Sequence, residues 1–344
     1  MASSRGRSIL GAGLLTLGLW AAGWHQPGLA QEKNSAQDKK PPDIVVTLLG
    51  TGSPIPEPGR LAPVSPQDRM NAATLVQAGE ETLLFDAGRG VVERLSQAGV
   101  KGSDITSIFL THFHSDHIVG LPDLWLTSRL TLGWGGRMKP MELVGPVGTK
   151  ALAGNLAKTF APDIAARPDQ PQIDLVGRDF EQDGVVFDRN GVKVTAFTVD
   201  HGPAKPAVGY RIDYKGRSVL LSGDTRMHDN VIKYGAGVDL LLHEVAAVNP
   251  ALLQKNPKLL AIFNLHASPE QCGEVFAKTR PKLAAFTHIV LMGAPAFAVP
   301  FPAPTVPDMI AETRKTYQGP LESGVDLMAF EIGDTVTVRR PMER

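Results

Sequence analysis

Four side chains of types that bind metal ions stand within a stretch of six residues: His112, His114, Asp116 and His117. In an extended loop His112 and His114 point the same way because side chains alternate, whereas the adjacent Asp116 and His117 must diverge. One pair can therefore serve one ion and the other pair a second ion beside it. Imidazole and carboxylate are both ligands that zinc accepts. The cluster predicts a two-metal site.

Three further candidate ligands stand far along the chain, and each follows an apolar segment that is predicted to be a strand. They are His201, Asp224 and His288. Polar groups at strand ends can converge without disturbing the core, so we expect these three to complete the site. The single cysteine, Cys272, can form neither a thiolate cluster nor an intramolecular disulfide. We therefore expect two zinc ions with nitrogen and oxygen ligands, with Mn²⁺ or Fe²⁺ as alternatives.

The segments that must position these residues alternate between β-branched runs and helical patterns from Asp43 onward. Hairpin-like strands come first and are followed by mixed strands and helices. This order predicts an α/β fold in which two sheets pack face to face with helices outside, in one domain over residues 43–344. Helices are predicted over 90–98, 118–130, 269–278 and 307–317. Strands are predicted over 44–49, 74–76, 82–86, 107–110, 141–144, 192–199, 208–212, 218–221, 239–242, 283–286, 327–330 and 335–338.

The first thirty residues have the pattern of a secretory signal peptide. Arg5 and Arg7 give a positive start, an apolar stretch follows, and small residues precede a cleavage position after Ala30. Residues 31–42 are polar and end in Pro-Pro, which predicts a flexible linker. We therefore expect a periplasmic or secreted bacterial protein with no membrane contact after cleavage. An uncleaved membrane anchor is the alternative interpretation.

The charge of the chain is balanced, with 35 basic and 35 acidic residues. Nucleic-acid binding usually relies on a basic excess that neutralises phosphates. Removal of residues 1–30 would delete two positive charges and leave a charge of about −2. On this basis we expect a small-molecule substrate and no nucleic-acid partner.

Several motifs together resemble the metallo-β-lactamase superfamily, and within it the ribonuclease Z and arylsulfatase branch. The resemblance implies a four-layer αββα sandwich over nearly the whole chain from Val45 to about Phe330. The cluster Thr111 to Gly120 marks the superfamily, and the His266 segment with Thr287-His288 marks the branch. The other motifs are Gly50-Thr51-Gly52, Phe85-Asp86-Ala87-Gly88, Ser222-Gly223-Asp224-Thr225 and His243-Glu244.

The resemblance also implies a role for each candidate residue. Asp224 resembles a ligand that bridges both ions, and a hydroxide between the ions would attack a phosphoryl or sulfuryl centre. Asp116 could also orient that hydroxide. His266 resembles a group that protonates the leaving oxygen or stabilises developing charge. The first ion would take His112, His114 and His201, and the second Asp116, His117 and His288.

These roles predict a dinuclear hydrolase of phosphodiesters or aryl sulfate esters. Ribonuclease Z holds its substrate with a long arm between the residues that correspond to His201 and Asp224. Here those residues are 23 positions apart, which leaves room for two strands and a turn at Lys215-Gly216. We therefore expect small esters as substrates. The alternatives are a ribonuclease Z-like endoribonuclease, a lactonase or β-lactamase-type hydrolase, and a metal-binding protein without catalysis.

Four residues are candidate substrate contacts. Trp125 could stack on a ring and Arg129 could bind an anion, and both follow the metal cluster. Arg60 follows the Gly-Thr-Gly loop and is a second candidate for anion binding. Phe297 lies in the apolar, Pro-rich stretch 292–302, which could cover the leaving group. Packing over a helix or a homodimer contact is the alternative role of this stretch.

Overall fold

The computed structural model describes residues 40–54, 69–131, 133–293 and 301–341. The predicted signal peptide, most of the predicted linker, Arg60 and Phe297 lie outside the described residues. Residues Pro41–Arg344 form one compact unit. Among the helices described, none has the length and apolar character needed to cross a membrane.

The first sheet has eight strands in the order β15-β14-β1-β2-β3-β4-β5-β6. Its one half is antiparallel, from β15 to β3, and the other half is parallel, from β3 to β6. Gly79, with a φ of 57°, makes the tight turn between β2 and β3. The strands are β1 (Ile44–Gly50), β2 (Ala73–Ala78), β3 (Glu81–Phe85), β4 (Ser107–Phe109), β5 (Met141–Pro146), β6 (Leu175–Phe180), β14 (Ala329–Ile332) and β15 (Val336–Arg339).

The second sheet has seven strands in the order β13-β12-β11-β10-β9-β8-β7. Neighbouring strands are antiparallel from β7 to β10 and parallel from β10 to β13. The carboxyl ends of the parallel strands therefore meet at one edge, where polar side chains can converge. The strands are β7 (Gly184–Arg189), β8 (Val192–Thr198), β9 (Val208–Tyr214), β10 (Arg217–Leu221), β11 (Leu240–Val248), β12 (Leu283–Met292) and β13 (Leu321–Ser323).

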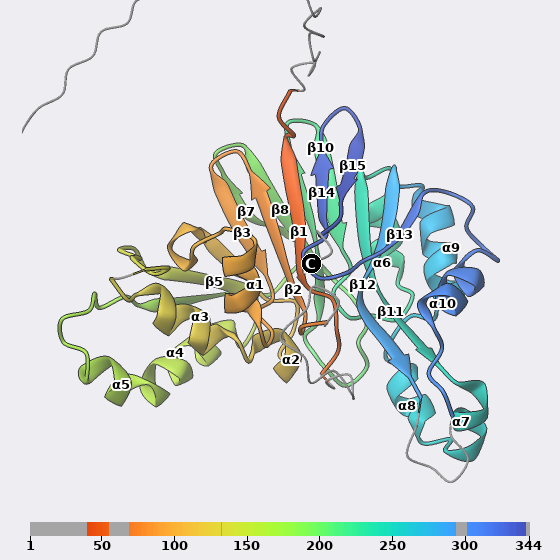
Figure 1. The fold of residues 1–344 in the computed structure, drawn as a ribbon, viewed down its shortest axis with the longest axis horizontal. Coiled ribbons are helices and arrows are strands. Elements are labelled where there is room, and N and C mark those ends of the chain that lie inside the picture. The colour runs from red at the N-terminus through yellow and green to blue at the C-terminus, as the bar shows by residue number, and fades with distance from the viewer. Residues whose placement is uncertain (1–39, 55–68, 132, 294–300, 342–344) are drawn as a thin grey trace, which may run out of the picture. The chain divides into compact units, whose positions relative to one another are not determined.

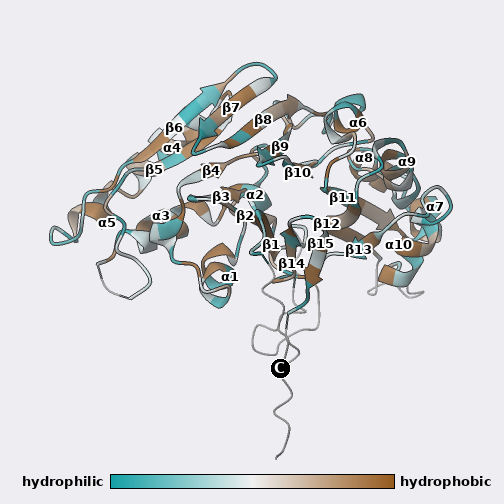
Figure 2. Ribbon diagram, turned by 90° about the horizontal axis from the view of Figure 1, so that it is seen from above, coloured by the Kyte–Doolittle hydropathy of each residue, from teal (hydrophilic) through white to brown (hydrophobic). Residues whose placement is uncertain are grey.

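Helices cover the outer faces of both sheets (Figures 1 and 2). The first group, from α1 to α5, accompanies the first sheet, and the second group, from α6 to α10, accompanies the second sheet. A 3-10 turn, η1, spans Gly102–Asp104. The helices are α1 (Val91–Gln97), α2 (Ser115–Ile118), α3 (Leu121–Ser128), α4 (Thr149–Thr159), α5 (Ala161–Ala165), α6 (Asp229–Gly235), α7 (Pro250–Lys255), α8 (Leu259–Phe263), α9 (Pro269–Thr279) and α10 (Val306–Thr313).

Three apolar layers hold these elements together. The central layer lies between the sheets and includes Val46, Phe85, Tyr210 and Leu242, all of them buried. A second layer joins the first sheet to its helices, and a third joins the second sheet to α6, α9 and α10. Burial of apolar surface on both faces of each sheet is the main stabilising contribution. The arrangement is the predicted αββα sandwich, and this prediction is confirmed.

The predicted helix over 118–130 is divided in two. α2 ends at Ile118, and α3 begins at Leu121. Between them, Gly120 lies close to the loop that carries Ala87 and Gly88. The amide of Gly120 donates to the carbonyl of Ala87, and a Cβ on Gly120 would lie 2.3 Å from the carbonyl oxygen of Gly88. The break lets α2 pack as a separate turn that carries Asp116 and His117.

Candidate metal centre

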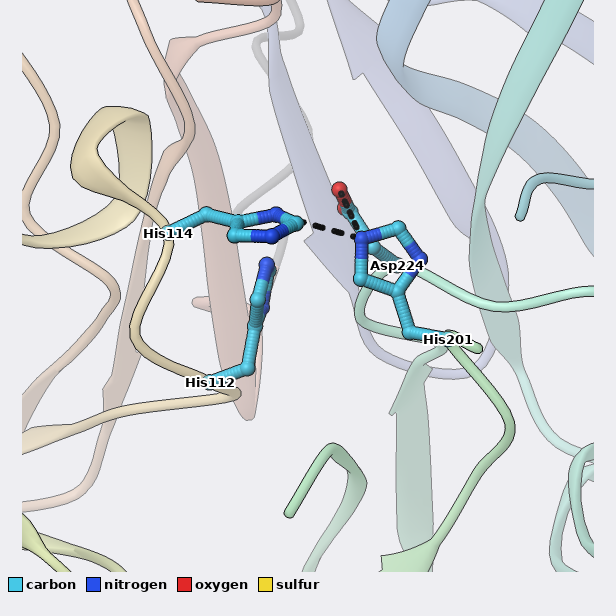
Figure 3. Close-up of side chains that lie close together, drawn as sticks. All are labelled: His112, His114, His201 and Asp224. Carbon is cyan, nitrogen blue, oxygen red and sulfur yellow. Dashed lines mark hydrogen bonds and ion pairs between the residues drawn. The ribbon is translucent and has the colours of Figure 1, made fainter. Parts of the chain in front are cut away.

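The first ligand group consists of His112, His114, His201 and Asp224, which point toward one another (Figure 3). His112 and His114 lie on the loop between β4 and α2, His201 follows β8, and Asp224 follows β10. One potential ligand atom from each residue lies within 4.8 Å of those of the others. His201 Nε2 is 3.2 Å from His114 Nδ1 and 3.8 Å from Asp224 Oδ2. The four residues come from three separate parts of the chain.

The second ligand group consists of Asp116, His117 and His288, all of them buried. His288 Nε2 lies 3.1 Å from Asp116 Oδ2, and His117 Nε2 lies 3.6 Å from the same oxygen. Asp224 Oδ2 is 3.4 Å from both His117 Nε2 and His288 Nε2. The carboxylate of Asp224 therefore lies between the two groups, where it could serve both.

Local structure brings Asp224 and the helical ligands into place. Gly223, with a φ of 61°, directs the chain out of β10 toward the site, and a Cβ there would lie 2.5 Å from the carbonyl oxygen of Val208. Asp116 and His117 are successive residues of one helical turn, so their side chains diverge. His288 lies within β12 with a φ of 41°, in the left-handed region.

The donor atoms fit divalent cations. His112 Nε2 and His117 Nε2 are buried and have no hydrogen-bond partner among the described residues. A buried polar atom without a partner is costly in free energy, so each such atom needs an explanation. A cation at each group would satisfy both nitrogens, and imidazole with carboxylate is a donor set that zinc accepts. The seven residues could therefore hold two ions.

Hydrogen bonds on the far ring nitrogens hold three of the histidines. His117 Nδ1 lies 2.7 Å from Asp86 Oδ2, and His201 Nδ1 donates to the carbonyl of Leu265 at 2.9 Å. His112 Nδ1 lies 3.0 Å from the hydroxyl of Thr111, which itself donates to Asp86. Such contacts fix the tautomer and leave Nε2 as the metal-binding atom. Sequence reasoning gave no role to Leu265, because a backbone carbonyl has no sequence signature.

The charges around Asp224, the carboxylate between the two ligand groups, also favour a bound cation. Burial would lower the pKa of His117, but the carboxylates of Asp224 and Asp86 raise it well above its ordinary value. Burial would raise the pKa of Asp224, but His288 and His117 hold it well below its ordinary value. Burial, together with the charge of His117, lowers the pKa of His112. The centre thus combines ionised carboxylates with a neutral imidazole at His112.

His266 lies beside the two groups, on the segment that connects α8 to α9. Its Nδ1 is 3.0 Å from Glu244 Oε2, and its ring centroid is 5.0 Å from that of His201. Glu244 is itself fixed, because its Oε1 accepts the amide of Ala267 at 2.9 Å. Burial would lower the pKa of His266, but Glu244 raises it to about 9. Near neutral pH the ring therefore carries a proton that it could donate.

A groove of about 1190 Å³ opens beside His266. It lies among helices α7 to α10, and its lining includes the apolar side chains of Leu253, Phe263 and Met309. Pro302, from the apolar stretch 292–302, also lines it. A substrate bound at the two ligand groups could extend into this groove past His266.

Two predicted substrate contacts do not join the site. Trp125 is 1% exposed, packs in the layer between the first sheet and its helices, and donates its indole N–H to the carbonyl of Ile173. Arg129 is also buried, and its Nε donates to the carbonyl of Pro171. We therefore assign Trp125 to the core, because no face of its ring is open to a substrate.

The chain matches the model of a family described as "Beta-lactamase superfamily domain" over residues 81–289. Ribonuclease Z of Mycolicibacterium gilvum (strain PYR-GCK) is 36% identical over 258 residues, which cover 72% of this chain and 84% of that protein. Two solved structures share the fold. The metallo-beta-lactamase fold protein YhfI from Bacillus subtilis has a TM-score of 0.62 at 16% identity and covers 83% of this chain and 98% of its own. The short form of human tRNase Z has a TM-score of 0.60 at 24% identity and covers 84% and 99%.

The 36% identical relative contradicts the prediction that no nucleic acid is a partner, because it is named ribonuclease Z. The prediction used the net charge, which sums the whole chain and does not describe the surface beside the site. The comparison favours the ribonuclease Z-like alternative over the small-ester interpretation. On the family match and the mycobacterial relative, the chain belongs to the metallo-β-lactamase superfamily of hydrolases, in its ribonuclease Z branch.

Proposed function

We propose that this chain is a dinuclear metal-dependent phosphodiesterase. The observation that carries the proposal is the position of Asp224, whose carboxylate lies between a three-histidine group and an Asp-His-His group. We propose zinc for both ions, because the donor set has no thiolate and consists of imidazole and carboxylate. When bound, a pair of divalent cations supplies a nucleophile at neutral pH and stabilises charge on the phosphoryl oxygens.

The side chains of this chain divide the remaining work. His112, His114 and His201 hold the first ion, Asp116, His117 and His288 hold the second, and Asp224 is shared. Asp116 also orients the attacking water by accepting a hydrogen bond. Protonated His266 donates to the leaving oxygen, and Glu244 keeps its ring oriented and charged. A buried carboxylate that supports an imidazolium in this way raises the fraction of the acid form at neutral pH.

RNA is the first substrate class that we propose. The support comes from the relatives named ribonuclease Z, of which one is 36% identical to this chain. The connection between His201 and Asp224 consists of β9 and β10, joined by a two-residue turn at Lys215 and Gly216. An RNA substrate would therefore be held by surfaces other than a long arm at this position.

Small aryl phosphodiesters and aryl sulfate esters are a second candidate class. The groove beside His266 favours it, because Leu253 and Phe263 give an apolar surface that an aromatic leaving group could contact. We expect Phe263→Ala to raise KM for aryl esters about tenfold, the scale of one lost apolar contact, with kcat little changed. Kinetics with aryl and small alkyl phosphodiesters would show whether the effect is specific to aryl groups.

One experiment separates the two classes. The metal-loaded full chain would be assayed on a precursor transfer RNA, on bis-nitrophenyl phosphate and on nitrophenyl sulfate, with Asp224→Ala as the inactive control. Site-specific cleavage of the RNA at low enzyme concentration would support the ribonuclease. Turnover of the small esters without any cleavage of RNA would overturn it in favour of the second class. No turnover of any of the three would contradict the proposed phosphodiesterase.

We also propose that residues 1–30 direct export, which would place the chain in the periplasm or outside the cell. The support is the sequence pattern of a positive start, an apolar stretch and small residues before Gln31. Expression of the full chain in a bacterial host, followed by fractionation and N-terminal sequencing, tests this. A periplasmic chain that begins at Gln31 is expected, and an uncleaved cytoplasmic chain would contradict it.

A further inference from the structure

His288 differs from His112, His117 and His201 in how its ring is held. The far nitrogens of His117 and His201 are anchored by Asp86 and by the carbonyl of Leu265. His288 Nδ1 is buried and has no hydrogen-bond partner in the described ranges. Its ring lies between two others, 5.1 Å from the ring of His117 and 5.8 Å from that of His266. Ring stacking restrains the plane but does not fix the tautomer, so the backbone must set the position of this ligand.

The backbone of His288 is itself unusual, with a φ of 41°. Left-handed conformations are uncommon for residues other than glycine and persist where the surrounding structure imposes them. The next residue, Ile289, donates its amide to the carbonyl of Thr51 at 2.7 Å. Thr51 follows β1 of the first sheet, whereas Ile289 belongs to β12 of the second. This hydrogen bond therefore ties His288 to the opposite sheet.

Thr51 is in turn fixed by a buried carboxylate. Both the amide and the hydroxyl of Thr51 donate to Asp326 Oδ1, at 2.9 and 2.7 Å. The other oxygen, Asp326 Oδ2, accepts the amide of Met70 at 2.7 Å and pairs with Arg94 Nη2 at 3.0 Å. The side chains of Asp326 and Arg94 are fully buried. We call Thr51, Met70, Arg94 and Asp326 the Asp326 clamp.

The position of the clamp matters for the second ligand group. Asp116 and His117 lie on α2, which follows β4 of the first sheet, whereas His288 comes from the second sheet. The distance between these two halves of the group thus depends on how the sheets are joined. The bond from Ile289 to Thr51 is such a joint, directly beside His288. The first ligand group also draws on both sheets, but none of its four residues is next in sequence to Thr51 or Ile289.

We propose that the Asp326 clamp positions His288 for the second metal ion, so that its loss weakens metal binding at the Asp116-His117-His288 group and spares the other. Asp326 and Thr51 are positioning residues, because they touch neither ligand atoms nor substrate. The inference rests on the metal-binding part of the proposed function and does not depend on the substrate. It also predicts an effect in the metal-free chain, on the amide of Ile289.

Matched variants test the proposal. Thr51→Val removes the hydroxyl that donates to Asp326, and Thr51→Ser keeps it. Asp326→Asn removes the negative charge that pairs with Arg94. Asp239→Asn is the control for the neutralisation of a buried carboxylate in an ion pair. Asp239 pairs with Lys282 at 2.6 Å just before β11, at the other end of that strand from the site.

Two readouts are measured on the full chain. Zinc titration with elemental analysis gives the number and affinity of bound ions, and amide hydrogen exchange of the metal-free chain gives the protection of Ile289. We expect Thr51→Val and Asp326→Asn to weaken binding of one ion about 10–100-fold, the usual effect of losing support for a ligand. Both should also increase exchange at Ile289. Thr51→Ser and Asp239→Asn should keep two ions and the wild-type exchange rate.

The results separate this inference from the proposed function. Two ions bound with wild-type affinity in Thr51→Val and Asp326→Asn would overturn the clamp while leaving the dinuclear centre intact. Equal loss of metal in Asp239→Asn would also overturn it, because general destabilisation would then be the cause. If Asp326→Asn does not fold, the two Thr51 variants decide the question. A wild-type chain that binds fewer than two ions contradicts the proposed function itself. In that case the amide hydrogen exchange of Ile289 in the variants still tests whether the clamp holds the backbone beside His288.

Discussion

The two ligand groups differ in exposure and in the way their members are held. In the first group His114 is exposed while His112, His201 and Asp224 are buried, and in the second group Asp116, His117 and His288 are all buried. His112 and His201 are anchored at their far nitrogens, whereas His288 depends on its backbone. Two metal sites with similar donor atoms can therefore differ in the rate at which they release an ion and in the affinity with which they bind it. The first group is open to solvent through one ligand, and the second group contains a ligand, His288, that depends on its backbone for its position.

The largest effect is expected from the residue that both groups share. Asp224→Ala should lower the metal content by at least one ion per chain, because the carboxylate lies within 3.8 Å of ligand atoms in both groups. Turnover should fall about 10³–10⁵-fold, since metal-ion stabilisation contributes several kcal/mol and each 1.4 kcal/mol is tenfold. Elemental analysis and initial rates measure both. A variant that keeps two ions and its activity would show that Asp224 is not shared.

His266 belongs to neither group, so its loss should separate chemistry from metal binding. His266→Ala should lower turnover about 10²–10⁴-fold, the usual contribution of general acid catalysis, with metal content unchanged. The loss should shrink for nitrophenyl leaving groups, which need little protonation. Rates on esters with good and poor leaving groups provide the measurement. Equal losses on both would indicate that the ring has only a structural role.

The pH dependence tests the partnership of Glu244 with His266. Since Glu244 raises the pKa of His266 to about 9, the protonated donor should persist through neutral pH and be lost as pH rises through about 9. The contribution of the His266–Glu244 pair to the free energy of unfolding has the same pH dependence. It is present in full below the ordinary pKa of histidine and is lost as the pH rises through about 9. Glu244→Gln should move the alkaline fall of the pH-rate profile to lower pH. An unchanged pH-rate profile in Glu244→Gln with full metal content would show that Glu244 has no part in proton donation by His266.

The smallest effect expected is a difference in metal release. Dialysis of the zinc-loaded chain against a chelator should remove zinc in two phases, with roughly one equivalent in the fast phase, because water reaches the first group through exposed His114. Alanine at His114 should speed the fast phase and leave the slow phase unchanged. His288→Ala should speed the slow phase and leave the fast phase unchanged. A single phase in the wild type would show that the two groups are equivalent.

Much of the architecture could be predicted from the sequence because local patterns were strong. The runs 44–49 and 107–110 correspond to β1 and β4, and the helix 269–278 corresponds to α9, whose Ser268 and Gln271 form a capping box. Residues 145–191 were not assigned, although they contain α4, α5, β6 and β7. In that region α4 buries only Thr149 and Ala153, and β6 and β7 have exposed apolar residues, so hydrophobic periodicity is weak.

The site was predicted unevenly for a similar reason. The ligand cluster was visible because its spacing is local, and the strand-end positions of His201 and Asp224 extended it. By contrast, β12 continues through His288 to Met292, where a strand end had been expected at Phe286. Asp326 lies 275 residues from Thr51 and no local pattern links them. The burial of Trp125 likewise follows from tertiary packing, which overrides the pattern of an exposed aromatic.

The positions of bound zinc ions, located by anomalous diffraction, test the central claim most directly. Crystals of the zinc-loaded chain should show two anomalous peaks, one at the His112-His114-His201 group and one at the Asp116-His117-His288 group, both in contact with Asp224. A single peak in protein that is fully active, or two peaks of which only one contacts Asp224, would contradict the shared dinuclear centre.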